Sequence, residues 1–313
     1  MSKTIGIAMI GVGAISGIYL ENITNVFKEI KLVGVCDLIR ERAENAQKKY
    51  NVPKLYETMH DAFADPEVDL VLNITRPYEH FEVSKAALLA GKHVYCEKPL
   101  GATFEEGVEL VRLAQEKGLY LGGAPDTFMG AGIQTCRKLI DDGYIGEPVG
   151  AAAFMICRGH ESWHPDPEFY YKFGGGPMLD MGPYYITALV NLMGGVSEVS
   201  GVAKKSFPTR TITSQPHYGE VVDVDVDTYV TGTLMFDNGA VGTIFTTFDI
   251  YGGDGCRIDI YGTEGTLSVP DPNGFGGPVK LLKDGKRTCF YEIEIKDSTD
   301  RLVAVASIVG AHV

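Results

Sequence analysis

The chain has 313 residues, of which 45% are hydrophobic and 22% charged, which is enough for two domains and excludes a disordered or fibrous polymer. The 41 acidic and 28 basic side chains give a formal net charge of −13, which argues against nucleic acid or an anionic membrane as a partner. No apolar run reaches the roughly 18 residues that span a bilayer, and no secretory signal is evident, so a cytoplasmic protein is expected. Six scattered cysteines without a C-x-x-C pair are typical of buried thiols in a reducing compartment.

The first βα unit predicts a dinucleotide-binding turn. Residues 5–10 form an apolar run typical of a buried parallel strand, and an amphipathic stretch runs to about Val26. Between them, glycines at positions 11 and 13 would form a tight turn and let the backbone approach a pyrophosphate at the helix N-terminus. The predicted contacts of this turn are Gly11, Gly13, Ala14, Ile15 and Ser16.

The next strand, residues 31–36, ends at Asp37, 21 positions beyond Ser16. An acidic residue at this distance is expected to bind the ribose hydroxyls of a dinucleotide. Asp37 favours NAD, because its carboxylate would repel a 2′-phosphate. Arg40 could accept that phosphate if the loop bends, so NADP stays open.

The alternation of strand and helix continues to about residue 124 and predicts an α/β domain with a doubly wound parallel sheet, here residues 1–124. Ligands of such sheets bind at the carboxyl ends of the strands. The further residues predicted for that edge are Thr75, Pro77, His80, Glu97 and Lys98.

Residues 125–313 show a different pattern. A helix is predicted over 128–142, followed by strand-like runs in succession and by a hairpin turn at residues 237–239 (Asp-Asn-Gly). This order predicts an α+β domain with a large, mostly antiparallel open sheet. Such a sheet has faces to cover, so a homodimer or homotetramer through it is expected.

One stretch of the second half combines glycines with residues that can handle protons. Gly174-Gly175-Gly176 would let the backbone approach a ligand closely. Asp180 and Tyr184 follow four residues apart, which on one helix places both side chains on the same face. Pro183 is tolerated only in a first helical turn, so the helix is expected to begin near Asp180.

A metal-site pattern also occurs in this half, since residues 160–164 read His-Glu-Ser-Trp-His. This H-E-x-x-H pattern binds zinc only when both histidines lie on one helix face. Pro165 biases His164 away from helical dihedrals, so no metal is expected. We interpret Trp163 and His164 as residues that line a substrate pocket, with packed loop side chains as the alternative.

The glycine turn, Glu97-Lys98-Pro99 and the Gly174–Gly176 run with Asp180-x-x-x-Tyr184 together resemble the Gfo/Idh/MocA oxidoreductases over nearly the whole chain. The resemblance implies a Rossmann domain, an α+β domain, bound NAD or NADP, and sugar or polyol substrates. It places Lys98, Asp180 and Tyr184 beside the nicotinamide. The pKa of a free phenol is about 10, which is too high for an efficient base at neutral pH. A nearby Lys98 ammonium would lower it by favouring the phenolate, so that Tyr184 would serve as general acid and base.

Three departures limit what the resemblance implies. Tyr184 stands where many inositol dehydrogenases have histidine, which resembles glucose–fructose oxidoreductase and dihydrodiol dehydrogenase instead. A segment at residues 124–128 that includes Asp126, a predicted substrate contact, differs from the Asn/His-Arg pattern of many members. The apolar tail 301–313 does not resemble the family's C-terminal helix, which is expected to be missing or altered. NAD-assisted glycoside cleavage and a dinucleotide-binding regulator remain alternatives to a sugar dehydrogenase.

Overall fold

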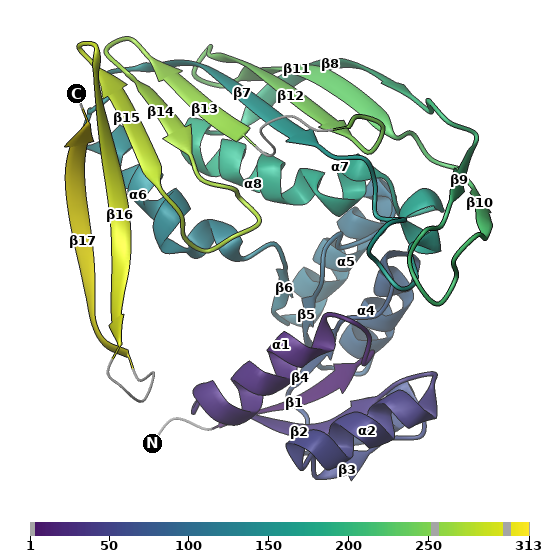
Figure 1. Cartoon of the computed structure of the whole chain (residues 1–313). Coiled ribbons are helices and arrows are strands. Elements are labelled where there is room, and N and C mark those ends of the chain that lie inside the picture. Colours follow the sequence, from purple (N-terminus) through teal and green to yellow (C-terminus); the bar gives the residue numbers. More distant parts are fainter. Residues whose placement is uncertain (1–3, 252–256, 297–301, 313) are drawn as a thin grey trace. The chain divides into compact units, whose positions relative to one another are not determined.

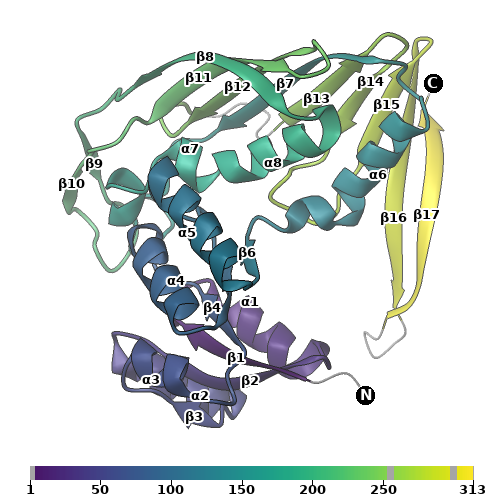
Figure 2. The same ribbon diagram turned by 180° about the vertical axis from the view of Figure 1, so that it is seen from behind.

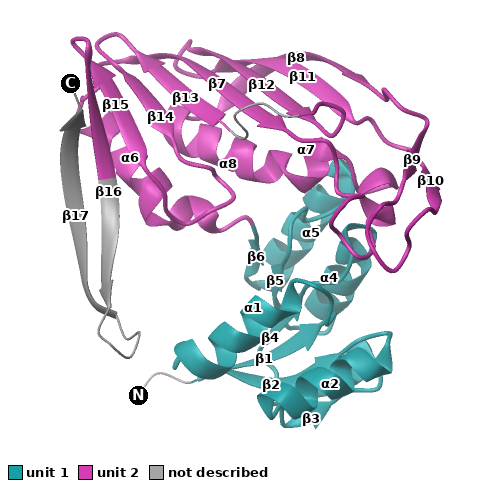
Figure 3. Cartoon of the chain, viewed as in Figure 1, with its two compact units in different colours: residues 1–124 teal, residues 125–313 magenta. Residues whose placement is uncertain are grey.

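The computed structural model describes residues 4–251, 257–296 and 302–312, with side chains described as far as residue 290. Contacts divide the chain into two compact units, Met1–Ala124 and Pro125–Val313 (Figure 3). Among the described residues, no helix is both long and apolar enough to cross a bilayer. Cys256, one of the six cysteines, lies outside the described residues.

Unit 1 is built on six parallel strands in the order β3-β2-β1-β4-β5-β6. The strands are β1 (Ile5–Ile10), β2 (Ile30–Cys36), β3 (Lys54–Leu55), β4 (Leu70–Asn73), β5 (His93–Cys96) and β6 (Leu121–Gly123). The helices are α1 (Ser16–Glu21), its π-helical continuation η1 (Asn22–Val26), α2 (Arg40–Tyr50), α3 (Met59–Ala64), η2 (Pro77–Glu79), α4 (His80–Leu89) and α5 (Phe104–Lys117). The predicted doubly wound sheet is confirmed, and its strand order reverses between β1 and β4, where such sheets bind ligands.

Alternating strand residues fill the two faces of this sheet. In β1, Ile7 and Met9 join a core with α1, η1 and α2, whereas Ala8 and Ile10 join a second core with α3, α4 and α5. Because helices cover both faces (Figures 1 and 2), these strands are continuous apolar runs in the sequence.

Helix α5 begins at a capping box that fixes the chain just after β5. Thr103 Oγ1 accepts the N–H of Glu106 at 3.2 Å, and Glu106 Oε2 accepts the N–H groups of Thr103 at 3.2 Å and of Ala102 at 2.7 Å. The segment that carries Lys98 is therefore anchored four residues further on, at Ala102.

Unit 2 holds a nine-stranded sheet in the order β17-β16-β15-β14-β13-β7-β12-β11-β8, antiparallel except between β7 and β12. Its strands are β7 (Pro148–Ile156), β8 (Val196–Lys204), β11 (Tyr229–Phe236), β12 (Val241–Thr247), β13 (Arg257–Gly262), β14 (Thr266–Val269), β15 (Val279–Lys283), β16 (Lys286–Lys296) and β17 (Leu302–His312). The remaining elements are η3 (Thr127–Met129), α6 (Ala131–Asp141), η4 (Glu168–Tyr171), α7 (Pro177–Asp180), α8 (Gly182–Met193) and the pair β9 (Thr209–Thr211) and β10 (Val221–Asp223).

The core of unit 2 lies between one face of this sheet and two helices. Ile133 and Leu139 of α6 and Tyr185 and Leu189 of α8 are buried against strand residues such as Ile258. Both helices lie on the same side of the sheet (Figures 1 and 2). The mostly antiparallel α+β architecture expected from the sequence is confirmed.

Two local expectations concern the ends of strands. The predicted turn at 237–239 does join β11 to β12, with Gly239 at φ +83° and Met235 paired with Val241. At the C-terminus, Leu302–His312 is a strand that pairs antiparallel with β16, and not a helix. The tail therefore extends the sheet of unit 2.

Candidate functional site

The turn between β1 and α1 has the geometry that a dinucleotide pyrophosphate requires. A Cβ atom at Gly13 would meet no chain atom within 4 Å, so the backbone there is open to a ligand. A Cβ at Gly11 would lie 2.7 Å from the carbonyl oxygen of Ile74, at a φ of +92°, so this glycine is required by the turn itself. Ser16 is buried, and its Oγ donates to the carbonyl of Gly13 at 2.7 Å, which closes the turn onto α1.

The start of α1 leaves backbone donors for an anion. Ile15 occupies the N-cap position without a side-chain hydrogen bond to the first turn. Ala14 and Ile15 are exposed beside Gly13. The residues of this turn therefore fit a pyrophosphate held by main-chain N–H groups.

Asp37 lies at the end of β2 and reaches the glycine turn. Its Oδ2 accepts the N–H of Val12 at 2.6 Å, and its Oδ1 accepts the N–H of Ile39 at 2.7 Å. Arg40 begins α2 and forms ion pairs with Glu44, at 2.9 Å, and with Glu57. The carboxylate is thus held beside the turn, whereas the guanidinium is engaged with two acidic side chains.

The polar residues after β4 form a buried network around His80. This residue is 1% exposed, its Nδ1 lies 2.6 Å from the carbonyl oxygen of Pro99, and its Nε2 lies 3.2 Å from that of Thr75. Burial lowers the pKa of His80, so the ring is held neutral. The ring holds together the segments that follow β4 and β5, and a cofactor contact from His80 stays a prediction.

Asn73, which sequence reasoning missed, orients the same segment. Its Nδ2 donates to the carbonyl oxygen of His80 and to Ser84 Oγ, both at 2.9 Å, and its Oδ1 accepts the Thr75 hydroxyl at 2.7 Å. Thr75 is partly buried, and Pro77 begins the short η2 helix that leads into α4. An asparagine at the end of a buried strand is the signal that could have found this role.

Glu97 and Lys98 follow β5. Glu97 Oε1 accepts the hydroxyl of Tyr19 from α1 at 2.6 Å, and Oε2 accepts the N–H of Lys98 at 3.0 Å. The Lys98–Pro99 peptide is cis. Glu97 therefore ties the end of β5 to the helix that follows the glycine turn, and sequence reasoning did not find its partner Tyr19.

The segment with Asp180 and Tyr184 differs from the single helix that was expected. Helix α7 begins at Pro177, three residues before Asp180, and ends at Asp180; α8 begins at Gly182. Pro183 lies in the first turn of α8, as expected, but its missing N–H interrupts the helical bonding and divides the segment at Met181. A helix does begin near Asp180, since α8 begins at Gly182, but the expectation that one helix carries both side chains was wrong: Asp180 ends α7 and Tyr184 lies in α8.

The glycine run before α7 packs against the chain itself. A Cβ at Gly175 would lie 2.4 Å from the carbonyl oxygen of Phe169, and the N–H of Gly176 donates to the carbonyl of Tyr170 at 2.7 Å. The close approach that Gly175 permits is to the η4 turn. Gly175 is thus accounted for by packing, although a ligand contact was expected.

Asp180 meets a histidine that sequence reasoning considered only as part of a metal motif. His160 Nε2 lies 3.0 Å from Asp180 Oδ2, and both side chains are 12% exposed. Residues 160–164 form a single turn instead of the extended helix of a zinc site. Among the described residues, no group of three or more His, Cys, Asp or Glu side chains could hold a metal ion.

The predicted substrate residues lie on two segments of unit 2. Trp163 is 62% exposed, and its ring packs edge-on against His164 at 5.4 Å. His164 Nδ1 accepts the N–H of Asp166 at 3.0 Å, and burial lowers the pKa of the ring, so the neutral tautomer carries its proton on Nε2. Asp126 precedes η3, and its carbonyl accepts the N–H of Met129 at 3.0 Å.

Both halves of the chain match models of one family. The model of the oxidoreductase family with an NAD-binding Rossmann fold matches residues 5–123, and that of the GFO/IDH/MocA C-terminal domain matches residues 133–268. The chain belongs to the GFO/IDH/MocA family. The first half of this GFO/IDH/MocA protein is thus an NAD-binding Rossmann domain.

Similar proteins agree with this assignment. An uncharacterized oxidoreductase, YrbE, of Bacillus subtilis is 24% identical over 100% of this chain and 88% of its own length. Myo-inositol 2-dehydrogenase of Thermotoga maritima is 27% identical over 83% of this chain and 74% of its own. A crystal structure of levoglucosan dehydrogenase with NADH and levoglucosan shares the fold, with a TM-score of 0.77 and 22% identity over 98% of this chain and 80% of that one.

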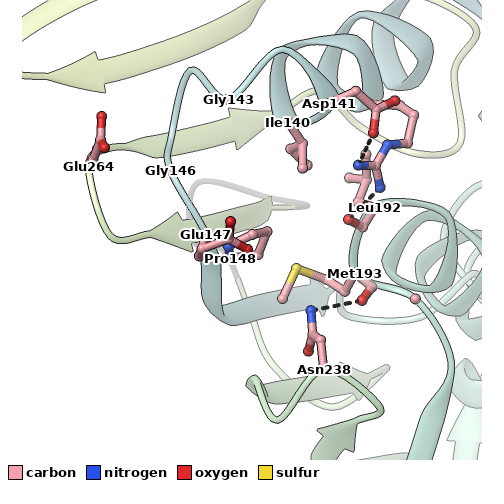
Figure 4. A pocket seen from close by; sticks show the side chains of 12 residues that line it. Ile140, Asp141, Gly143, Gly146, Glu147, Pro148, Leu192, Met193, Asn238 and Glu264 are labelled. Carbon is pink, nitrogen blue, oxygen red and sulfur yellow. Dashed lines mark hydrogen bonds and ion pairs between the residues drawn. The ribbon is translucent and has the colours of Figure 1, made fainter.

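A cavity of about 630 Å³ in unit 2 of the GFO/IDH/MocA protein contains none of the predicted site residues. It lies where α6 and α8 end and β7 begins (Figure 4). Arg137 donates there to the carbonyl oxygens of Asn191 and Leu192, at 3.1 and 2.9 Å, and pairs with Asp141. The arginine thus caps the C-terminus of α8, which is a structural role.

Proposed function

We propose that this protein is a dehydrogenase that transfers a hydride between NAD and a secondary alcohol of a sugar or polyol. The observation that carries the proposal is the partly buried Asp180 with Tyr184 close by in sequence, in a chain whose other unit is an NAD-binding domain. Relatives named for inositol, xylose and levoglucosan support the substrate class.

Each of three residues has a distinct part in the proposed reaction. When bound, the nicotinamide supplies the hydride chemistry. Tyr184 takes up or returns the proton of the substrate hydroxyl, and the Lys98 ammonium favours the phenolate form of that group. Asp180 accepts a hydrogen bond from the substrate hydroxyl or from Lys98 and so holds its partner in place.

The cofactor proposal is NAD in preference to NADP. Asp37 is held beside the glycine turn, which supports the proposal that its carboxylate binds the ribose hydroxyls, and Arg40 is paired with Glu44 and Glu57. An Asp37→Ala variant is expected to bind NADH about 10- to 100-fold more weakly, because hydrogen bonds to a charged group are lost. NADPH affinity should be unchanged or higher. Equal weakening of both cofactors would contradict the proposal.

The test of the activity is NADH formation against a panel of sugars, inositols and sugar acids. Tyr184→Phe should lower kcat by about 10²- to 10⁴-fold with the NADH dissociation constant unchanged. Tyr218→Phe is the matched control, since this exposed tyrosine of unit 2 lies outside the proposed site. Full turnover by Tyr184→Phe would remove the residue from the mechanism.

The same assay separates the alternatives. One equivalent of NADH per product identifies a dehydrogenase, whereas product without net NADH identifies cofactor-assisted glycoside cleavage. Tight NADH binding with no turnover on any substrate identifies a regulator.

Combining Lys98→Met with Tyr184→Phe should lower kcat little more than the worse single variant does, because the effects of residues that act as one unit are not additive.

Substrate contacts are proposed from Asp126, Trp163 and His164. The exposed Trp163 ring offers an apolar face for a sugar ring, and His164 offers an Nε2–H donor for a hydroxyl. Trp163→Ala should therefore raise KM for the substrate more than it lowers kcat. An unchanged KM would exclude Trp163 as a contact.

Self-association is proposed through the outer face of the unit 2 sheet. Phe245 of β12 has its ring 4.8 Å from that of Tyr229 and 6.3 Å from that of Phe154, and Val202 of the edge strand β8 is 68% exposed. An apolar face of this kind is typical of an interface between copies. Light scattering should give a dimer or tetramer for the wild type and a smaller species for Phe245→Asp. Equal masses would exclude this face.

A further inference from the structure

The contact between His160 and Asp180 joins residues 20 positions apart within unit 2. His160 lies in the turn after β7, and Asp180 is the last residue of α7. The imidazole Nε2 and the carboxylate Oδ2 are 3.0 Å apart, and each side chain is only 12% exposed. An ionised carboxylate can only accept a hydrogen bond, so the contact requires the proton on Nε2.

Aromatic rings hold the imidazole of His160 in place. The ring centroids of Tyr170, Phe248 and Trp163 lie 4.0, 4.7 and 5.2 Å from that of the imidazole. Tyr170 comes from η4 and Phe248 directly follows β12, so the walls of this cage belong to separate parts of unit 2. Rotation of the imidazole away from Asp180 would have to displace at least one of these rings.

Glu161, the next residue, anchors the same turn to the body of unit 2. Its carbonyl oxygen accepts the N–H groups of Thr213 and Ser214, at 2.8 and 3.0 Å. Its carboxylate accepts from Arg210 at 3.0 Å, and the side chain of Arg210 is only 3% exposed and also pairs with Asp249. A buried arginine between two carboxylates makes this a rigid base for His160.

We propose that His160 is a positioning residue, which fixes the Asp180 carboxylate through an Nε2–H donor. The inference deepens the proposed function and rests on it for its consequence in catalysis. With Oδ2 bound to the caged imidazole, the plane of the carboxylate is set before substrate arrives. Asp180 then meets a substrate hydroxyl or Lys98 in one orientation, without reorganisation during the reaction.

Tyr170 also belongs to the surroundings that this orientation depends on. Burial raises the pKa of its phenol, and the charges of Asp180 and Tyr184 raise it further. The phenol therefore stays protonated and neutral at neutral pH, so Tyr170 packs on the imidazole without adding a charge to the pair.

The test compares two substitutions of His160. His160→Phe keeps an aromatic ring in the cage but has no donor, and should lower kcat by up to about 10²-fold with NADH affinity unchanged. His160→Gln places an amide N–H near the position of Nε2 and should recover most of that loss. Turnover by His160→Phe within twofold of wild type would overturn the inference, as would His160→Gln no better than His160→Phe at equal melting temperature.

The matched control is His217→Phe, which removes a histidine that pairs with Glu220 at 2.9 Å on the exposed surface. It should leave kcat and KM unchanged, because an exposed pair of this kind contributes little. A loss equal to that of His160→Phe would mean that the substitution acts through the fold and would overturn the inference.

A spectroscopic measurement separates the pair from the proposed reaction. Nitrogen-15 spectra of the wild type should show His160 protonated on Nε2, and Asp180→Asn should change that signature without unfolding the chain. An unchanged spectrum would overturn the hydrogen bond between His160 and Asp180 even if the enzyme is active. A changed spectrum in a protein that oxidises no sugar or polyol would support the pair and reject the proposed function instead.

Discussion

Two glycines in the turn after β1 are expected to respond in opposite ways to alanine. At Gly11, alanine would adopt a φ of +92° with its Cβ 2.7 Å from the carbonyl oxygen of Ile74. A non-glycine residue in this region costs about 1–3 kcal/mol, and the overlap adds to that. At Gly13, a Cβ meets no chain atom within 4 Å, so the free chain accommodates the methyl group.

Gly11→Ala should therefore change the melting temperature, and Gly13→Ala should change the affinity for NADH. For a unit of 124 residues, 1 kcal/mol lowers the melting temperature by about 4 °C, so Gly11→Ala should melt about 4–12 °C lower. Gly13→Ala should melt with the wild type. Its methyl group fills the space that a pyrophosphate would enter, and losing one charge-assisted hydrogen bond of about 1.5–3 kcal/mol weakens NADH binding about 10- to 100-fold.

Calorimetry of the apoprotein and fluorescence titration with NADH measure the two effects independently. Gly13→Ala with wild-type NADH affinity would refute the reasoning that places the pyrophosphate at this turn. An unchanged melting temperature for Gly11→Ala would refute the strain argument. A third variant, Gly118→Ala at the C-cap of α5, is the control for positive φ without a close contact, since nothing lies within 4 Å of its Cβ.

Two further predictions concern buried polar groups. Arg210→Leu leaves the carboxylates of Glu161 and Asp249 buried without their cation and should destabilise unit 2 by about 3–5 kcal/mol. Adding Glu161→Gln and Asp249→Asn should restore part of that stability. Calorimetry measures the loss and the recovery. Burial lowers the pKa of His80 below its unfolded value of about 6.5. Below about pH 6.5 the unfolded chain takes up a proton that the folded chain does not, so unit 1 should lose stability as the pH falls from about 6.5 to the folded pKa. His80→Gln cannot take up this proton, and an equally steep acid loss in that variant would assign the effect to another group.

Much of unit 1 could be predicted because its signals are local. The apolar run of β1, the glycine turn and Asp37 all lie within the first 37 residues. Each is a local pattern whose backbone conformation can be predicted from the residues that form it. The network behind that edge could not be predicted in the same way. Tyr19 with Glu97, and His80 with the carbonyl of Pro99, depend on how a helix and two strands pack, which no periodicity records.

The segment around Asp180 shows how local reasoning fails in unit 2. Proline was correctly placed in a first helical turn, but the turn belongs to α8, and a separate short helix ends at Asp180. The glycines before it were interpreted as room for a ligand, yet Gly175 faces the backbone of η4. A sequence shows that a glycine needs space without showing whether a ligand or the chain itself occupies that space.

The histidines of the H-E-x-x-H pattern show why a motif must be tested against its partners. A zinc site needs two imidazoles with lone pairs directed at one point. Here His160 directs Nε2 at Asp180, and His164 already uses Nδ1 to accept the N–H of Asp166. Both histidines lie in one turn, and their ring nitrogens have different partners. A sequence that matches a zinc-binding helix therefore places His160 against Asp180, the carboxylate that the proposed reaction needs. The variants His160→Phe and His160→Gln test whether this contact matters for turnover.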